Sequence, residues 1–242
     1  MPVRIRLCAL LVCATISSPL LAQKKAENAP GWAGEGKLTY MLSQGNSDTE
    51  TLGSKAKAVY NGDRWRGTGA GEALNSSSKG ERTAEKYFAS MQLDLKFDQD
   101  RYLFTLLEHE DDRFSGFHYQ TSLTAGFGQT VFDNDRHKLA FEAGPGYRRS
   151  EIEEGDSVEE EVVVRAAVDY RLKLSESTTL TEELNTLAGS ELTVTKAVTE
   201  LKTKINSTLS TLIGHDLKFT SDVPPGRAKT DSRIYVGLNI DF

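Results

Sequence analysis

Apolar and polar residues alternate with a period of two along most of this chain. The alternation is clearest in residues 87–97, 162–174 and 234–242, where every second side chain is apolar and most of the others are not. Successive side chains of a β-strand point to opposite faces, so each segment has one apolar and one polar face. After residue 22, helical periodicity is weak and no segment reaches the ~20 apolar residues of a membrane-spanning helix. The pattern therefore predicts an all-β chain.

Turn residues divide the alternating sequence into twelve candidate strands. Most would be about 10–15 residues long, which exceeds the ~5–6 residues usual in soluble sheets and suits the ~9–11 residues that a tilted strand needs to cross a membrane. The expected strands start near Gly31, Thr49, Arg64, Glu81, Arg101, Phe117, His137, Val158, Thr178, Leu192, Thr208 and Lys229. Tight turns, such as the one at Asn61-Gly62-Asp63, alternate with looser connections over residues 75–80, 111–116, 150–157 and 221–228.

These features favour an antiparallel up-and-down transmembrane β-barrel of about twelve strands over residues 31–242. Short turns on one side and longer loops on the other are typical of outer-membrane barrels. Aromatic residues near the strand ends suit the girdles at the two membrane interfaces: Trp32, Tyr40, Tyr60, Trp65, Tyr87, Phe97, Tyr147, Tyr170, Phe219 and Phe242. The alternative is a soluble periplasmic β-sandwich, because an antiparallel sheet in water also alternates.

The first 22 residues have the composition of a cleavable signal peptide. A basic start with Arg4 and Arg6 precedes an apolar run that ends at Ala22, which places the expected cleavage between Ala22 and Gln23. An uncleaved membrane anchor is the alternative. Residues 23–30 would then form a periplasmic segment before the barrel, and the protein would lie in the outer membrane of a Gram-negative bacterium. Both cysteines precede the cleavage site, which leaves no thiol chemistry in the mature chain.

The C-terminal residue points to the same destination. The last alternating strand ends the chain on Phe242, an ending that resembles the signal read by the outer-membrane assembly machinery. We therefore expect that machinery as a partner, together with outer-membrane lipids and lipopolysaccharide. Nucleic acid is not expected, because the formal net charge is −6 and binding it depends on Lys and Arg that neutralise phosphates.

Several turn and strand landmarks suggest a family. Residues 32–36 (Trp-Ala-Gly-Glu-Gly) and 43–49 (Ser-Gln-Gly-Asn-Ser-Asp-Thr) resemble the opening of the YdiY-like salt-induced outer membrane proteins, whose function is otherwise unknown. Residues 112–116 and 144–148 are similar to mid-chain landmarks of that family, although Phe117-His118-Tyr119 departs from its pattern. The resemblance implies an outer-membrane location and a link to salt or osmotic stress, and it implies no reaction.

No motif in the chain specifies an enzyme, a cofactor site or a metal site. His109 lies between Glu108 and Glu110, but on a strand it faces away from both. The alternative from the enzyme class is a lipid-modifying barrel, in which a Ser or Thr would be activated by His118 or His215. No Gly-x-Ser-x-Gly motif supports that alternative.

The polar faces of the strands carry charges of both signs, which would line or fill the interior of the barrel. A barrel of about twelve strands lies between small filled barrels and wide porins. We therefore expect a structural, stress-related or narrow-pore role without catalysis, and the sequence leaves the oligomeric state open. The candidate lumen-lining residues are Lys55, Lys57, Arg66, Glu72, Asp94, Lys96, Glu142, Arg165, Asp169, Arg171, Lys173, Glu200, Lys202, Lys204 and Asp216.

Overall fold

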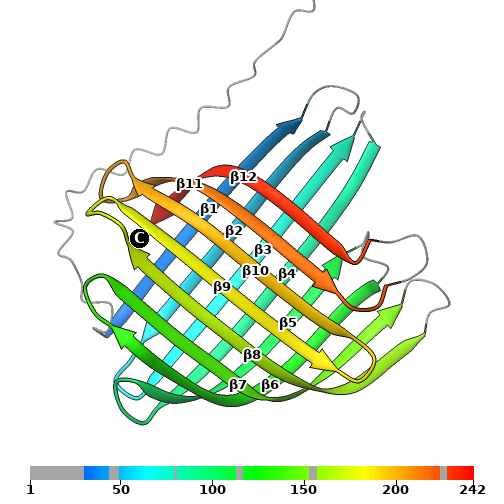
Figure 1. The fold of residues 1–242 in the computed structure, drawn as a ribbon, viewed down its shortest axis with the longest axis horizontal. Helices are drawn as coiled ribbons and strands as arrows, with labels where there is room; N and C mark the ends of the chain where they lie inside the picture. The colour runs from blue at the N-terminus through cyan, green and yellow to red at the C-terminus, as the bar shows by residue number, and fades with distance from the viewer. Residues whose placement is uncertain (1–29, 44–48, 79–80, 113–116, 153–156, 224–227) are drawn as a thin grey trace, which may run out of the picture.

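The chain forms a closed antiparallel barrel of twelve strands in chain order (Figure 1). The computed structural model describes residues 30–43, 49–78, 81–112, 117–152, 157–223 and 228–242. Each strand pairs with its sequence neighbours, and β1 pairs with β12 to close the ring. The strands are β1 Gly31–Ser43, β2 Thr49–Asn61, β3 Trp65–Ser78, β4 Glu81–Lys96, β5 Arg101–Asp112, β6 Phe117–Asp133, β7 His137–Ile152, β8 Val158–Lys173, β9 Thr178–Gly189, β10 Thr193–Lys204, β11 Leu209–Thr220 and β12 Thr230–Asp241.

This architecture confirms the predicted fold class and strand number, and it replaces the sandwich alternative. Every strand begins at the expected residue or one residue later. Three expected loops begin later than predicted: residues 111–112 belong to β5 and residues 150–152 to β7. The longest of these stretches is residues 75–78, which belong to β3. They pair with β2 on one side and β4 on the other, from Asn75 opposite Leu52 to Ser78 opposite Thr49. Backbone hydrogen bonds to two neighbouring strands outweigh the polar composition of this stretch.

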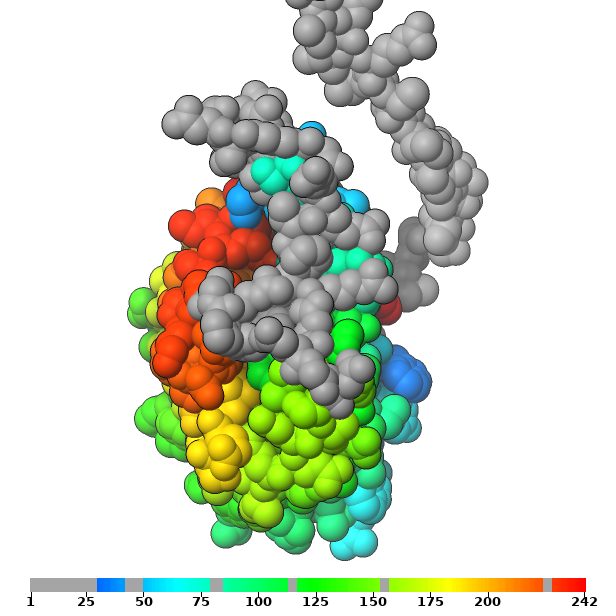
Figure 2. Space-filling model, turned by 90° about the vertical axis from the view of Figure 1, so that its right-hand side faces the viewer, coloured from blue at the N-terminus to red at the C-terminus, as the bar shows by residue number. Residues whose placement is uncertain are grey.

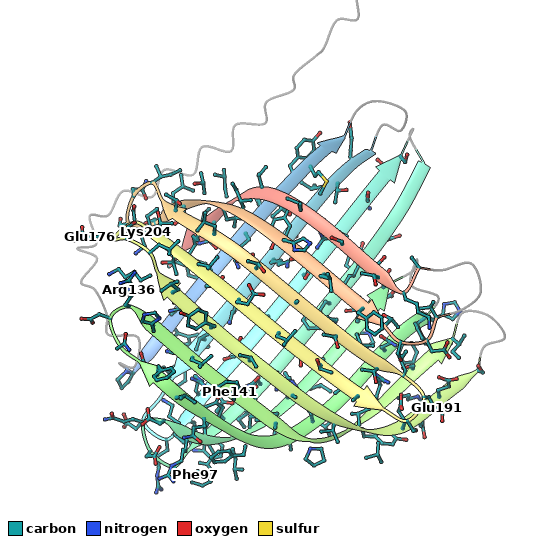
Figure 3. All side chains as sticks on the ribbon, viewed as in Figure 1. Phe97, Arg136, Phe141, Glu176, Glu191 and Lys204 are labelled. Carbon is teal, nitrogen blue, oxygen red and sulfur yellow. The ribbon has the colours of Figure 1, made fainter. Side chains whose placement is uncertain are left out.

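The tight turns share one device at one end of the barrel. At the β4–β5 turn the Asp98 carboxylate accepts hydrogen bonds from the backbone N–H groups of Asp100 and Arg101. Asn134 plays the same part in the β6–β7 turn and Asn206 in the β10–β11 turn. Such side-chain hydrogen bonds fix the turn and the register of the strands that follow. We call this end the short-turn end; the other, which carries Glu191, is the loop end (Figure 3).

The barrel has an apolar exterior and a polar interior. Large apolar side chains are exposed on every strand, and Trp32, Met91 and Val162 are each about 70% exposed, at 71%, 69% and 72%. The buried side chains include carboxylates and guanidinium groups, among them Asp94, Glu142 and Arg165. Among the described residues there is no helix of the length and apolar character that a membrane crossing requires. A water-soluble protein would instead bury its large apolar side chains and expose its charged ones.

The C-terminal residue helps to close the ring. β1 pairs with β12 from Glu35 opposite Asp241 to Tyr40 opposite Val236. Beyond Asp241, Phe242 exchanges both backbone hydrogen bonds with Gly34, at 2.7 and 2.9 Å. The Phe242 ring lies over Gly34 on the outer face, where a Cβ would be only 2.4 Å from a ring carbon. The terminal aromatic therefore packs over the seam, and a side chain at position 34 would have to displace its ring.

Candidate functional site

The candidate functional site is the interior of the barrel, where charged side chains from all parts of the ring meet. They reach it because the residues between the exposed apolar positions point inward. These inward groups form ion-paired clusters toward the loop end and the middle, and water-exposed charges toward the short-turn end.

The first cluster is built around Glu110 of β5. Its carboxylate lies 2.6 Å from the Lys196 ammonium, 2.7 Å from that of Lys218 and 3.4 Å from that of Lys86. Lys218 belongs to β11, and five strands separate β11 from β5 in either direction around the ring. β5 and β11 are therefore opposite walls. We call these four residues the Glu110 cluster; its ion pairs cross the lumen.

A second group continues the Glu110 cluster toward the β1–β12 seam. Lys55 lies 3.5 Å from both Glu72 and Asp216, and Arg233 lies 2.5 Å from Asp216 and 3.7 Å from Glu72. Lys86 is 3.9 Å from Glu72 and so connects this group to the Glu110 cluster. The two groups together form a layer of alternating charge across the barrel.

Another cluster, which we call the Glu142 cluster, joins β3, β4, β5, β7 and β8. Arg165 donates to the Glu142 carboxylate at 2.6 Å, and Tyr102 donates to it at 2.8 Å. Gln92 donates to both Glu142 and Asp94, each at 2.9 Å, and Arg66 pairs with Asp94 at 2.6 Å. The Tyr102 and Phe104 rings fill the space beneath the two guanidinium groups, at 4.8 and 5.2 Å. This half of the barrel is therefore filled.

Glu200 of β10 holds a smaller cluster on the other half. It accepts from Lys37 at 2.6 Å and from Tyr235 at 2.8 Å. Nearer the short-turn end, Lys202 lies 3.2 Å from Asp241 and 3.7 Å from Glu35. These contacts connect β10 to β1 and β12 through the interior, across the seam that closes the barrel.

Some inward side chains remain in water. Lys57, Asp169, Arg171 and Lys204 share the inward face with the buried residues of their strands, yet each is exposed. Lys57 and Asp169 belong to opposite walls, because five strands separate β2 from β8 in either direction around the ring. The interior is therefore wet toward the short-turn end and closed above it.

The structure brings together most of the residues that the sequence suggested for the lumen. They meet as Lys55 with Glu72 and Asp216, Arg66 with Asp94, and Glu142 with Arg165. Glu200 and Lys202 instead pair with Lys37 and Asp241, which the sequence did not single out. Lys96 instead donates to Asn61 and Gly62 and stabilises the β2–β3 turn. Lys57, Asp169 and Lys173 have no ion pair within 4 Å among the described residues. The proposed cleavage residues Ala22 and Gln23 lie outside the described part of the chain.

Sequence reasoning missed the residues that cross the lumen. The sequence indicated Glu110 only as a neighbour of His109, and it did not predict that Lys86, Lys196 and Lys218 line the lumen. The alternation of strand side chains could have placed Glu110 inward, because Phe104 and Leu106 share its face. Its contact with Lys196, 86 residues away, depends on how the ring closes.

The histidines lie on the outer face or near the strand ends and do not form a metal site. His109 is exposed and accepts or donates a hydrogen bond with Thr121 at 2.8 Å, while Glu110 points inward. Among the residues that the structure describes, no group of three His, Cys, Asp or Glu could hold a metal ion. The Ser232 hydroxyl lies 2.9 Å from His215 on the outer face. That pair is the start of a nucleophile–base arrangement, but no carboxylate contacts the imidazole among the described residues.

Comparison with known proteins agrees with the fold. The uncharacterized protein YdiY of Escherichia coli (strain K12) is 27% identical over 207 residues, which cover 84% of this chain and 81% of YdiY. An outer membrane channel from Pseudomonas putida F1 has a similar fold, with a TM-score of 0.53 and 10% identity over 91% of this chain and 98% of the channel. The translocator domain of the autotransporter NalP from Neisseria meningitidis gives a TM-score of 0.47 and 12% identity, with 90% of each chain covered.

The family resemblance read from the sequence is confirmed. The model of the family described as "Protein of unknown function, DUF481" matches residues 36–242, which include all but the start of β1 and the whole of the remaining barrel. The chain therefore belongs to the DUF481 family of proteins of unknown function.

Proposed function

We propose that this protein is an outer-membrane barrel whose interior is a narrow pore for small ions, closed by the Glu110 cluster and without catalytic activity. The observation that carries the proposal is the pair of contacts from Glu110 to Lys196 and Lys218, which cross from one wall to the other. A barrel that served only as a scaffold could be filled by apolar side chains. Here the contacts that cross the lumen are ion pairs, which water can separate.

The exterior supports the membrane location. Exposed aromatic side chains lie near both ends of the strands: Trp32, Tyr60 and Trp65 toward the short-turn end, and Tyr40, Tyr87 and Tyr147 toward the loop end. Paired strand edges around the whole ring satisfy the backbone, as a lipid environment demands. Lipids and lipopolysaccharide would contact this surface, and the seam residue Phe242 would be offered to the assembly machinery.

The arrangement of charges gives a physical link to salt. Dissolved ions screen interactions between charges that touch water, and the screening length falls from ~8 Å at 0.15 M to ~3 Å at 1 M. The Lys196 side chain of the Glu110 cluster is 32% exposed, so part of the cluster is open to screening. High salt would weaken the cross-lumen ion pairs and favour the open lumen. This is the proposed basis of a role in salt or osmotic stress.

Two measurements on the full-length chain test the proposal. Fractionation should recover it in the outer membrane, and its gel mobility should change on boiling, as expected for a folded barrel. In planar bilayers the purified barrel should give small, infrequent openings at 0.1 M salt and longer openings at 1 M salt, after correction for bulk conductivity. Recovery in the soluble periplasm would contradict the membrane location. A barrel that stays silent at both salt concentrations would contradict the pore.

A further inference from the structure

A cavity lies inside the barrel beside the Glu110 cluster, between β4 to β7 on one wall and β9 and β10 on the other. It leaves about 450 Å³ free of protein atoms, including the part that is open to solvent. Pockets that bind small molecules have volumes of about 300–1,000 Å³. The lining includes Phe88, Glu108, Ser122, Arg148, Asn185 and Leu187.

Three lining residues form a row across adjacent strands on one wall of the cavity. Glu108 of β5 is the register partner of Ser122 of β6, and Ser122 is the register partner of Arg148 of β7. Since neighbouring strands lie about 4.8 Å apart, the backbones of Glu108 and Arg148 are about 10 Å apart. The row therefore presents a carboxylate and a guanidinium group with the short Ser122 side chain between them.

Arg148 is buried with incomplete hydrogen bonding. It is 2% exposed, and its Nη2 donates to the Glu161 carboxylate and to the backbone carbonyl of Leu192. Its Nε and Nη1 have no hydrogen-bond partner within the described parts of the chain. Buried N–H groups are nearly always paired, so an acceptor is expected beside them.

The contacts of Arg148 fix its guanidinium group below the rim of the loop end. Glu161 also accepts a hydrogen bond of 3.0 Å from the backbone N–H of Glu191 in the β9–β10 turn. Figure 2 shows this rim, where the β9–β10 turn (yellow) lies beside the start of β8 (yellow-green). The guanidinium group is therefore held in place before any molecule enters the cavity.

Glu108 and Asn185 offer acceptors to the same cavity. The Glu108 carboxylate accepts a hydrogen bond of 3.3 Å from Ser122, and among the described residues no cation lies within 4 Å of it. The Oδ1 atom of Asn185, on β9, is buried and likewise has no donor in the described chain. The cavity thus lacks an acceptor at Arg148 and a donor at Glu108 and Asn185.

The charges around the cavity favour a molecule that carries both signs. A simple anion at Arg148 would lie near the carboxylates of Glu108 and Glu161, and a simple cation at Glu108 would lie near Arg148 and Lys196. A zwitterion has a partner for each of its charges and adds no net charge to the interior, where an unpaired charge is costly.

We propose that this cavity binds a small zwitterion, with its carboxylate on Arg148 and its ammonium group on Glu108 and Asn185. α-Amino acids with a small apolar side chain belong to this class, and Phe88 and Leu187 line the cavity where that side chain would pack. The inference rests on the proposed pore for its physiological meaning, since it names a solute that the lumen would hold.

Equilibrium dialysis of the full-length barrel in detergent tests the ligand class, with radiolabelled L-alanine as the probe. Binding should saturate at one L-alanine per barrel. Propionate lacks the ammonium group and ethylamine lacks the carboxylate, so each should compete at least about tenfold less well, because each loses a hydrogen bond to a charged group. Absence of saturable L-alanine binding would overturn the proposal. Stronger competition by D-glucose would also overturn it, in favour of a neutral polyol.

Glu108→Gln tests the assignment of the two charges. It keeps the shape of the side chain and removes its charge, so L-alanine should bind about tenfold more weakly, while propionate should bind at least as well as before because a repulsion is gone. The matched control is Asp169→Asn, on the exposed inner wall of β8 outside the cavity lining, which should bind L-alanine like the wild type. Equal weakening of both ligands in a heat-modifiable Glu108→Gln barrel would overturn the assignment.

Binding in detergent does not depend on conductance, so the site and the pore fail separately. A barrel that binds L-alanine but stays silent in planar bilayers would overturn the pore and leave the site. A barrel that conducts but does not bind L-alanine would overturn the site and leave the pore. The competition series on the wild type decides the ligand class whether or not the Glu108→Gln variant folds.

Discussion

Replacement of Glu110 by Gln is the most informative perturbation of the barrel interior. Glu110 is 6% exposed and is the only carboxylate within 4 Å of Lys196 in the described residues, and the nearest to Lys218. Glu110→Gln keeps the shape of the side chain but removes the charge that holds Lys86, Lys196 and Lys218 together. The three ammonium groups then repel one another, and they move toward water at the mouths of the lumen. The cross-lumen contact is therefore lost.

The magnitude follows from the burial of the pair. Removal of one partner of a buried ion pair costs about 3–5 kcal/mol. The lower end, about 3 kcal/mol, is expected here because Lys196 is partly exposed and can regain water. Unfolding by urea in detergent should show that loss. In planar bilayers, the same variant should open more often and should no longer depend on salt beyond the bulk conductivity.

The control for this experiment is Glu142→Gln. Glu142 is also 6% exposed, but its partners Gln92, Tyr102 and Arg165 lie on β4, β5 and β8, in the filled half of the barrel. This variant should lose stability without a comparable gain in conductance. The reasoning is refuted if Glu110→Gln is folded and less stable yet conducts like the wild type, or if both variants open the pore equally.

Three further predictions concern the seam, a turn and the outer face. Gly34→Leu places a side chain where the Phe242 ring lies, so the folded, heat-modifiable form should accumulate more slowly; normal assembly would contradict the role of the seam. The pKa of Asp98 is below its ordinary value, first because the Arg101 side chain donates to it and then because two turn N–H groups do. A carboxyl with a lowered pKa stabilises the fold above the unfolded pKa of about 3.9, and that stability is lost as the pH falls through the lower folded value. The advantage of the wild type over Asp98→Asn in urea midpoint should therefore be present at pH 7 and vanish in strong acid; a constant difference would refute it. Ser232→Ala should leave phospholipid and lipopolysaccharide ester hydrolysis at the background of the wild type, because no catalysis is proposed; an activity that only the wild type shows would overturn that view.

The sequence by itself determined the class of fold. Period-two alternation and turn residues such as Asn61 and Asp63 depend on local geometry, so they could be recognised before any contact was known. The same alternation assigned Arg165 and Asp169 to the inner face and Val164 to the outer face. The strand boundaries followed because turns interrupt the alternation. The polar composition of residues 75–78 predicted a loop, which was wrong, because only their pairing with β2 and β4 makes them part of a strand.

The tertiary structure decided which inward charges meet. Alternation gives the face of a residue but not its height in the barrel or its neighbour across the lumen, because both depend on the register of all twelve pairings and on closure between β1 and β12. For this reason Glu110 could not be matched with Lys218, 108 residues away. The same holds on the outer face: Glu182, Thr199 and His215 have no sequence spacing in common, and only the register of β9, β10 and β11 aligns them.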